Sequence, residues 1–168
     1  HIERAASRFP GLVTTLRFPQ NRGKRAALEA GFRRGKGDVM VTIDSDSVID
    51  PDTLLAMAGS FRDPKVGAVA GKVSVYNRAA GIIPRMLNVR FVLSFDFLRA
   101  AQSTYGTVYC CPGALAAYRT EAVRRVLERW VAQEFLGARC TFGEDRAMTN
   151  DILEAGYDSV YQRAGVVH

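Results

Sequence analysis

The stretch "DVMVTIDSDSVIDPD", residues 38–52, decides the fold class of this chain. Its first part, "DVMVTID" at 38–44, is rich in apolar and β-branched residues and predicts a strand buried in a sheet. Asp50 before Pro51 is typical of a helix N-cap followed by the first helical residue, so a helix is expected to about Phe61. A buried strand that leads through a polar loop into a helix is the repeating unit of α/β proteins.

The same alternation continues along the chain and predicts one α/β domain over residues 1–168, with a mixed, mostly parallel sheet flanked by helices. Further strands are expected at 12–18, 66–76, on both sides of Pro112 and Gly113 in "VYCCPGALAAYR", and at "YDSVYQ", 157–162. Further helices are expected at 24–34, at 82–101, from an N-cap at Thr120, and from Glu144 to Ala155 before Gly156.

Composition narrows the possible partners. The 168 residues carry a formal charge of +6, which suits an anionic partner such as a nucleotide or a lipid surface. The basic residues are scattered, so no nucleic-acid stripe is indicated. Three cysteines without zinc spacing predict reduced thiols and a cytosol-facing domain. The uncharged run 100–118 contains too many polar and glycine residues for a transmembrane helix.

The acidic cluster of Asp44, Ser45 and Asp46 follows a predicted buried strand. In open α/β sheets, ligands bind beyond the carboxyl ends of the strands. Two carboxylates in one loop are suited to Mg²⁺ or Mn²⁺, which commonly share their oxygen ligands with substrate phosphates. The alternative is that both aspartates only form turn hydrogen bonds.

Two other positions admit a functional and a structural interpretation. Lys24 begins a predicted helix after a glycine, where its ammonium and free backbone N–H groups could contact a phosphate; the alternative is a solvated pair with Arg25. Glu144 and Asp145 begin a later helix. There they either favour the helix dipole or supply a general base that accepts a proton from a sugar hydroxyl.

Four ordered motifs resemble the catalytic domain of processive family-two glycosyltransferases, which include hyaluronan, chitin and cellulose synthases. The motifs are "TIDSDSVIDPD" (42–52), "LRAAQS" (98–103), "VYCCPGALAAYR" (108–119) and "QEFLGARCTFGEDRAMTN" (133–150). The resemblance covers about residues 20–165 and is closest to the hyaluronan synthase group.

The resemblance implies a GT-A fold and a metal-dependent, inverting transfer from a UDP-sugar, with UDP-GlcNAc as the first candidate, to the growing end of a glycan. It also implies a place at the cytoplasmic face of the cell membrane, with membrane association through segments outside this chain and no nucleic acid partner. By this resemblance, Lys24 and Asp44 contact the nucleotide, and Asp46 binds the metal ion together with Asp44. Asp145 is the general base, with Glu144 beside it. Arg146 either pairs with an acid or contacts the acceptor.

The chain departs from the family at one loop. It reads Cys111-Pro112-Gly113-Ala114 where the family usually reads Cys-Ser-Gly-Pro, in a loop that lies near the acceptor in relatives. Because proline removes a backbone donor, acceptor preference is open at this point. Cys110 and Cys111 are expected to be packing residues. The family's uracil-binding strand and its Gln-x-x-Arg-Trp motif are expected outside this chain.

Several alternatives stay open at the sequence level. Trp130 is either a helix-face anchor or an aromatic floor for a sugar, and residues 85–99 form either a helix packed on the sheet or a segment near a membrane surface. The domain could also belong to a non-processive transferase that acts on a lipid or glycan acceptor. A third possibility is a non-catalytic nucleotide-sugar-binding domain.

Overall fold

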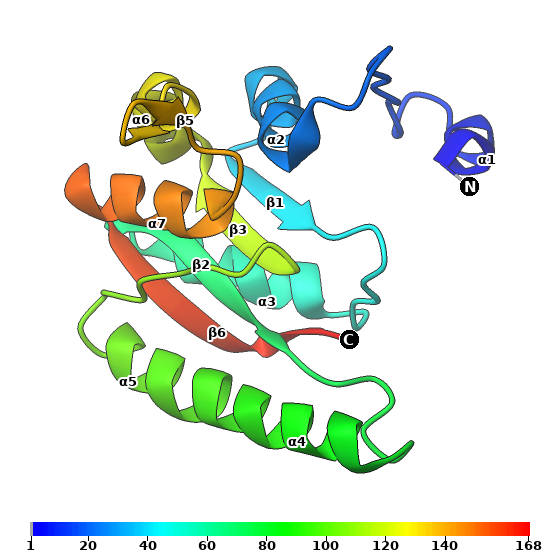
Figure 1. Cartoon of the computed structure of the whole chain (residues 1–168), viewed down its shortest axis with the longest axis vertical. Coiled ribbons are helices and arrows are strands. Elements are labelled where there is room, and N and C mark those ends of the chain that lie inside the picture. The colour runs from blue at the N-terminus through cyan, green and yellow to red at the C-terminus, as the bar shows by residue number, and fades with distance from the viewer. Residues whose placement is uncertain (1) are drawn as a thin grey trace.

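A four-stranded sheet forms the centre of the molecule in the computed structural model, which describes residues 2–168. The strands are β1 (Val39–Ile43), β2 (Val66–Val73), β3 (Leu115–Arg119) and β6 (Asp158–Val167), in the spatial order β1-β3-β2-β6 (Figure 1). β3 is antiparallel to both neighbours and β2 is parallel to β6, so three of the four strands run in one direction. The predicted mixed, mostly parallel sheet is confirmed.

Helices flank this sheet, and the expected alternation holds from α2 onward. They are α1 (Ile2–Arg8), α2 (Gly23–Arg34), α3 (Thr53–Gly59) with a 3₁₀ turn at Ser60–Arg62, α4 (Ile82–Phe91), a π-helical stretch η2 (Val92–Arg99), α5 (Ala100–Ser103), α6 (Thr120–Val131) and α7 (Glu144–Glu154). A short hairpin of β4 (Glu134–Phe135) and β5 (Ala138–Arg139) joins α6 to α7.

The sheet separates two hydrophobic clusters because side chains alternate across a strand. Ala116 and Tyr118 of β3 belong to the larger cluster, which is covered by α2, α6 and α7. Leu115 and Ala117 belong to the smaller cluster, where they pack with Met57 of α3.

The long helical segment 82–103 lies along β6 (Figure 1) and confirms the helix expected at 82–101. Its inner face is anchored by Asp96, which accepts hydrogen bonds from Lys72 Nζ at 2.7 and 2.9 Å, and by Phe95 against the ring of Tyr161. Its outer face leaves large apolar side chains exposed, among them Phe97 at 67%. Within residues 2–168, no helix has the length and apolar character needed to cross a membrane.

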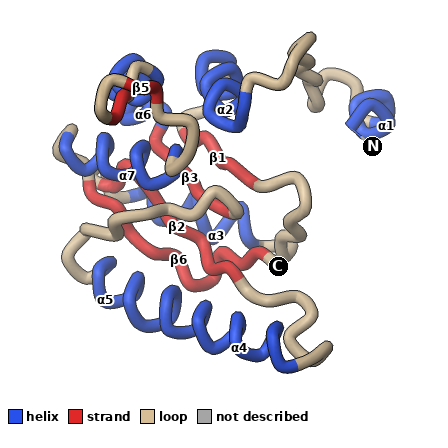
Figure 2. The backbone as a smooth tube through the Cα atoms, viewed as in Figure 1, coloured by secondary structure: helices blue, strands red, loops and turns tan. Residues whose placement is uncertain are grey.

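Two expected strands are wrong. Residues 12–18 form a loop (Figure 2). No strand of residues 2–168 pairs with them, and a strand needs a hydrogen-bonded partner. Residues 108–111 do not form a strand either. The Cys111 N–H donates to Thr149 Oγ1 at 3.0 Å, where a ladder bond was expected, and only β3 survives of the predicted pair.

Two helix starts also differ from the expectation. α3 begins at Thr53, two residues after Pro51, and its N-cap is Asp52. Thr120 is the first residue of α6 and not its cap, because its hydroxyl donates to the Gly37 carbonyl. In both cases a contact outside the helix decides the boundary. The Thr53 hydroxyl donates to Val166 O at 2.8 Å.

Candidate active site

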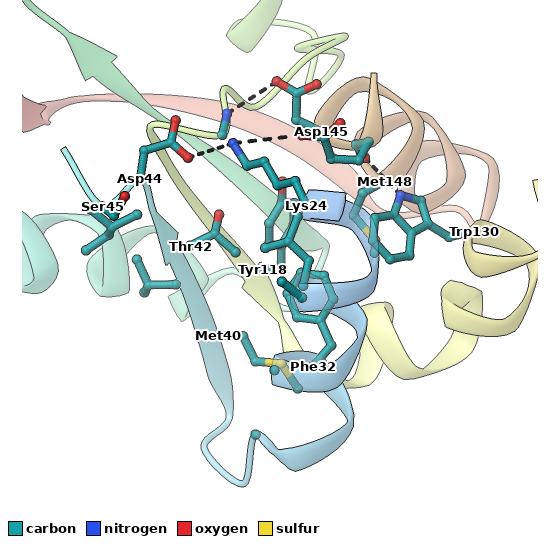
Figure 3. A pocket seen from close by; sticks show the side chains of 18 residues that line it. Lys24, Phe32, Met40, Thr42, Asp44, Ser45, Tyr118, Trp130, Asp145 and Met148 are labelled. Atoms are coloured by element: carbon teal, nitrogen blue, oxygen red, sulfur yellow. Dashed lines mark hydrogen bonds and ion pairs between the residues drawn. The ribbon is translucent and has the colours of Figure 1, made fainter. Parts of the chain in front are cut away.

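The first acidic cluster lies in the turn after β1. The Ser47 N–H donates to Asp44 O at 3.1 Å and closes this turn directly after the strand. The loop beyond is fastened to the end of β6, because Val48 and His168 exchange two backbone hydrogen bonds of 2.9 and 2.8 Å. The backbone therefore fixes where the turn stands, while the Asp44 carboxylate points from it toward α2 (Figure 3).

Lys24 in the first turn of α2 joins the two acidic clusters. Its Nζ lies 2.6 Å from Asp44 Oδ1 and 3.8 Å from Glu144 Oε1 (Figure 3). Although partial burial alone would lower it, the hydrogen bond to Asp44 and the charges of Asp44, Glu144 and Asp145 raise the pKa of Lys24 above its ordinary value. The ammonium is therefore held protonated between acids that stand about a hundred residues apart in sequence.

The second acidic cluster forms the first turn of α7, which starts after Gly143 in a left-handed conformation at φ 72°. Both oxygens of Asp145 accept backbone N–H groups: Oδ1 from Arg146 at 2.7 Å and Oδ2 from Gly113 at 3.3 Å. A carboxylate has about four lone-pair positions, so further acceptor capacity is left on each oxygen. The Asp145 carboxylate is thus fixed in orientation and still able to accept a proton.

These groups share one cavity of about 660 Å³. Its polar end holds Lys24, Asp44, Ser45, Gly113, Glu144 and Asp145, and its wall is formed mostly by apolar side chains of α2, β1 and α6. Such a site has one fixed cation and three carboxylates at the carboxyl end of β1. It can bind a polar ligand at its charged end and hold a metal ion if the ligand supplies the remaining oxygens.

The other predicted site residues lie outside this cavity lining. Asp46 is exposed in the turn after Asp44, and no group of three or more metal-ligating side chains occurs in residues 2–168. Arg146 is exposed, with its guanidinium 5.3 Å from the centroid of the Tyr109 ring. Cys111 is fully buried, and burial raises the pKa of its thiol to about 12, which confirms it as a packing residue.

Two buried residues connect these elements, and the sequence pattern did not single out their contacts. Arg25 is buried and donates to the Trp130 carbonyl at 2.5 Å, so the interpretation as a solvated pair with Lys24 is wrong for Arg25. Trp130 is fully buried, which confirms the anchor interpretation. The amphipathic pattern of α6, with Trp130 on its apolar side, indicates that Trp130 is buried. The same pattern carries no information about the position of Arg25.

Comparisons with known proteins show which family this chain resembles. Residues 1–127 match the family model described as Glycosyl transferase family 2. The chain is 41% identical over 146 residues to an N-acetylglucosaminyltransferase of Azorhizobium caulinodans, which covers 87% of this chain and 37% of that relative. It is 37% identical over 142 residues to hyaluronan synthase 3 of Homo sapiens, covering 83% of this chain and 26% of the synthase.

Among solved structures, the mannosyltransferase PcManGT from Pyrobaculum calidifontis, in complex with GDP-Man and Mn²⁺, superimposes with a TM-score of 0.71 and 25% identity over 99% of this chain and 42% of that one. This likeness confirms the GT-A-type fold. The chain spans little more than a third of the length of the first curated relative. The family model over residues 1–127 and the likeness to these relatives lead to one conclusion: the chain belongs to glycosyl transferase family 2.

Proposed function

We propose that this chain is the catalytic segment of a polysaccharide synthase that transfers N-acetylglucosamine from UDP-GlcNAc to the growing end of a glycan. The observation that carries the proposal is the meeting of the two acidic clusters around Lys24, with Asp44 and Glu144 2.6 and 3.8 Å from its Nζ. The names of the relatives, N-acetylglucosaminyltransferase and hyaluronan synthase, support the sugar and the polymer.

The donor binds with its diphosphate at the polar end of the cavity. Lys24, in the first turn of α2, supplies a positive charge for a phosphate. Asp44 and Asp46 fit a Mg²⁺ or Mn²⁺ ion, because such ions take one or two protein carboxylates and complete their shell with phosphate oxygens and water. Bound there, the ion would neutralise the charge that develops on the leaving diphosphate.

Asp145 acts as the general base. Its two backbone hydrogen bonds hold the carboxylate in place, and it can take the proton of the acceptor hydroxyl as that oxygen attacks the donor carbon. Displacement from the face opposite the diphosphate inverts the anomeric centre. The amide of Gly113, in the loop that distinguishes this chain from its family, makes one of these bonds, so the loop contributes to the geometry of the base.

A membrane-bound setting on the cytoplasmic side is part of the proposal. The outward face of α4 and η2 supports it, with Met86, Leu93 and Phe97 all more than half exposed. Arg85 and Arg90 on the same segment are exposed and form no ion pair within residues 2–168. Apolar side chains beside free arginines suit an anionic membrane surface. Flotation with vesicles that contain anionic lipid tests this point, and binding unchanged by Met86→Asp with Phe97→Asp would contradict it.

The transfer reaction is tested by incubating the full-length protein with a panel of UDP-sugars, a glycan primer and MnCl₂. We expect UDP release and chain growth with UDP-GlcNAc, loss of both on metal chelation, and a β-linked product from the α-linked donor. Growth by one sugar only would favour the non-processive alternative. Tight UDP binding without any transfer would favour the non-catalytic domain.

A further inference from the structure

The first turn of α7, which carries both acidic residues of the second cluster, is held by a side chain from another helix. The indole Nε1–H of Trp130 in α6 donates to the backbone carbonyl of Glu144 at 2.8 Å (Figure 3). Trp130 is 0% exposed, so its ring is held within the core. The position of the Glu144 peptide, and with it the direction of the Asp145 side chain that follows, depends on where this indole stands.

The indole is in turn positioned by Arg25 of α2. The guanidinium Nη1–H donates to the Trp130 carbonyl at 2.5 Å, Nη2–H donates to Gln133 Oε1 at 3.0 Å, and the guanidinium carbon lies 4.8 Å from the centroid of the Trp130 ring. The planar guanidinium of Arg25 therefore fixes Trp130 and the residues that follow it, through two N–H donors and through its flat face. Lysine cannot reproduce this pattern, because it has a single flexible ammonium.

Arg25 has properties that packing alone does not explain. It is 9% exposed and forms no ion pair within residues 2–168. Its Nε–H finds no hydrogen-bond partner in the described chain. Burying an unpaired charge is unfavourable unless its hydrogen bonds compensate, and a buried N–H without a partner calls for an explanation. Its contacts all converge on the end of α6, directly behind the acidic turn of α7.

We propose that Arg25 and Trp130 are positioning residues for the Glu144–Asp145 turn. Arg25 orients Trp130, Trp130 holds the Glu144 carbonyl, and the chain from α2 through α6 to α7 sets the Asp145 carboxylate against the donor site. Lys24, the neighbour of Arg25, contacts the polar end of the cavity from the same helical turn. The first turn of α2 thus contributes to both parts of the site. Arg25 holds the turn of the general base through Trp130, and Lys24 contacts the end of the cavity where the diphosphate would bind. The inference rests on the proposed transferase function.

The experiment compares Arg25→Lys and Trp130→Phe with the matched control Arg119→Lys. Arg119 also donates to backbone carbonyls, at Val66 and Asp63, and its guanidinium also lies over a ring, that of Phe61 at 5.6 Å. It stands at the opposite end of the sheet, paired with Val39 at the start of β1. The control therefore removes an anchor of the same kind without touching the acidic turn.

In the full-length protein, kcat for UDP-GlcNAc is expected to fall roughly 10- to 100-fold in both test variants, because a small displacement of a reacting group has an effect of that order. KM for the donor, and UDP affinity measured with MnCl₂, should stay close to wild type. Hydrogen exchange of the Ala147 amide, which donates to Gly143 O at 3.0 Å, should accelerate in both. Arg119→Lys should lose thermal stability but keep kcat and the Ala147 protection.

Equal kcat values in Arg25→Lys and Arg119→Lys would overturn the proposal, and so would a loss of UDP affinity as large as the loss of kcat. If Trp130→Phe does not fold, the comparison of Arg25→Lys with Arg119→Lys still tests the proposal, because Arg25→Lys keeps the indole of Trp130. If wild type transfers no sugar, the proposed function fails, and the exchange rate of the Ala147 amide still tests the positioning. Unchanged protection in Arg25→Lys would then refute it independently.

Discussion

The turn that carries Asp44 and Asp46 and the helix start that carries Glu144 and Asp145 hold their carboxylates by different means. In the first, the backbone is fastened to the end of β6, but Asp46 is exposed. The sole hydrogen-bond and ion-pair partner of the Asp44 carboxylate among the described residues is the flexible ammonium of Lys24. In the second, Asp145 accepts two backbone N–H groups, and the peptide before it is held by a fully buried indole.

This difference fits two different tasks. A metal ion that arrives with its substrate needs ligands that adapt, because the ion completes its coordination with phosphate oxygens and water. A general base needs a fixed position relative to the reacting hydroxyl. The comparison therefore teaches that a loosely held acid pair and a tightly held one can serve one reaction, and that each should respond differently to substitution.

The largest effect is expected at the tightly held site. Asp145→Asn keeps the shape of the side chain and one of its two accepted hydrogen bonds, because the amide nitrogen cannot accept the other. It removes the basic oxygen, so kcat should fall by roughly 10²- to 10⁴-fold, the range that general-base catalysis contributes. UDP affinity should be close to wild type. Transfer rates of the full-length protein and calorimetry with UDP and MnCl₂ measure the two quantities.

Asp151→Asn is the matched control for this substitution. Asp151 lies on the same helix α7, pairs with Arg129 at 3.0 Å and is absent from the cavity lining. It should leave transfer unchanged. Equal losses of transfer and UDP affinity in Asp145→Asn would show that Asp145 binds the donor and is not the base, and the contrast between the two clusters would disappear.

A smaller effect, of a different kind, is expected at the loosely held site. Asp46→Ala should lower Mn²⁺-dependent UDP affinity roughly tenfold or more, the change that ~1.4 kcal/mol of lost binding produces. Affinity for UDP without metal should not change. Asp52→Ala, at an exposed acid in the same loop, is the control and should bind like wild type. If Asp46→Ala kept the Mn²⁺-dependent UDP affinity of wild type, the assignment of the metal ion to this turn would be wrong.

Much of this arrangement was predictable from the sequence because it depends on local patterns. The strand at 39–43, the helix from Glu144 and the meeting of the two acidic clusters follow from apolar runs, breakers and family spacing. The strand expected at 12–18 fails because β-propensity does not supply a pairing partner. The roles of Asp46 and Asp145 stay predictions.

The contacts that hold the second cluster were not predictable. Trp130 and Gly113 reach α7 from two separate segments of the chain, Arg25 reaches Trp130 from a third, and each contact depends on how helices pack across the sheet. A single sequence shows an arginine at a helix start, and the usual expectation for such a residue is exposure. Tertiary packing overrides that expectation here, and only coordinates show which carbonyl the guanidinium meets.

The smallest effect is expected at Gly113, which touches both clusters. A Cβ on Gly113 would stand 2.7 Å from Lys24 Nζ and 3.9 Å from Asp44 Oδ1. The ammonium is the mobile end of a flexible side chain, so it should move aside at little cost. Because the Lys24–Asp44 pair is partly exposed to solvent, Gly113→Ala should change the free energy of unfolding by less than about 1 kcal/mol.

The same substitution separates the two clusters functionally. Alanine keeps the backbone N–H that Asp145 accepts, so kcat should stay near wild type, whereas displacement of Lys24 should weaken UDP binding several-fold, measured by calorimetry with MnCl₂. Gly59→Ala, in α3 with open space around the added methyl, is the control and should not alter binding. In a Lys24→Met background the effect of Gly113→Ala on UDP affinity should vanish, because the group that the methyl displaces is gone. If Gly113→Ala weakened UDP binding as much in the Lys24→Met background, the methyl group would act on Asp44 or Asp145 directly. The loop of Gly113 would then influence both acidic clusters, and the substitution would not separate them.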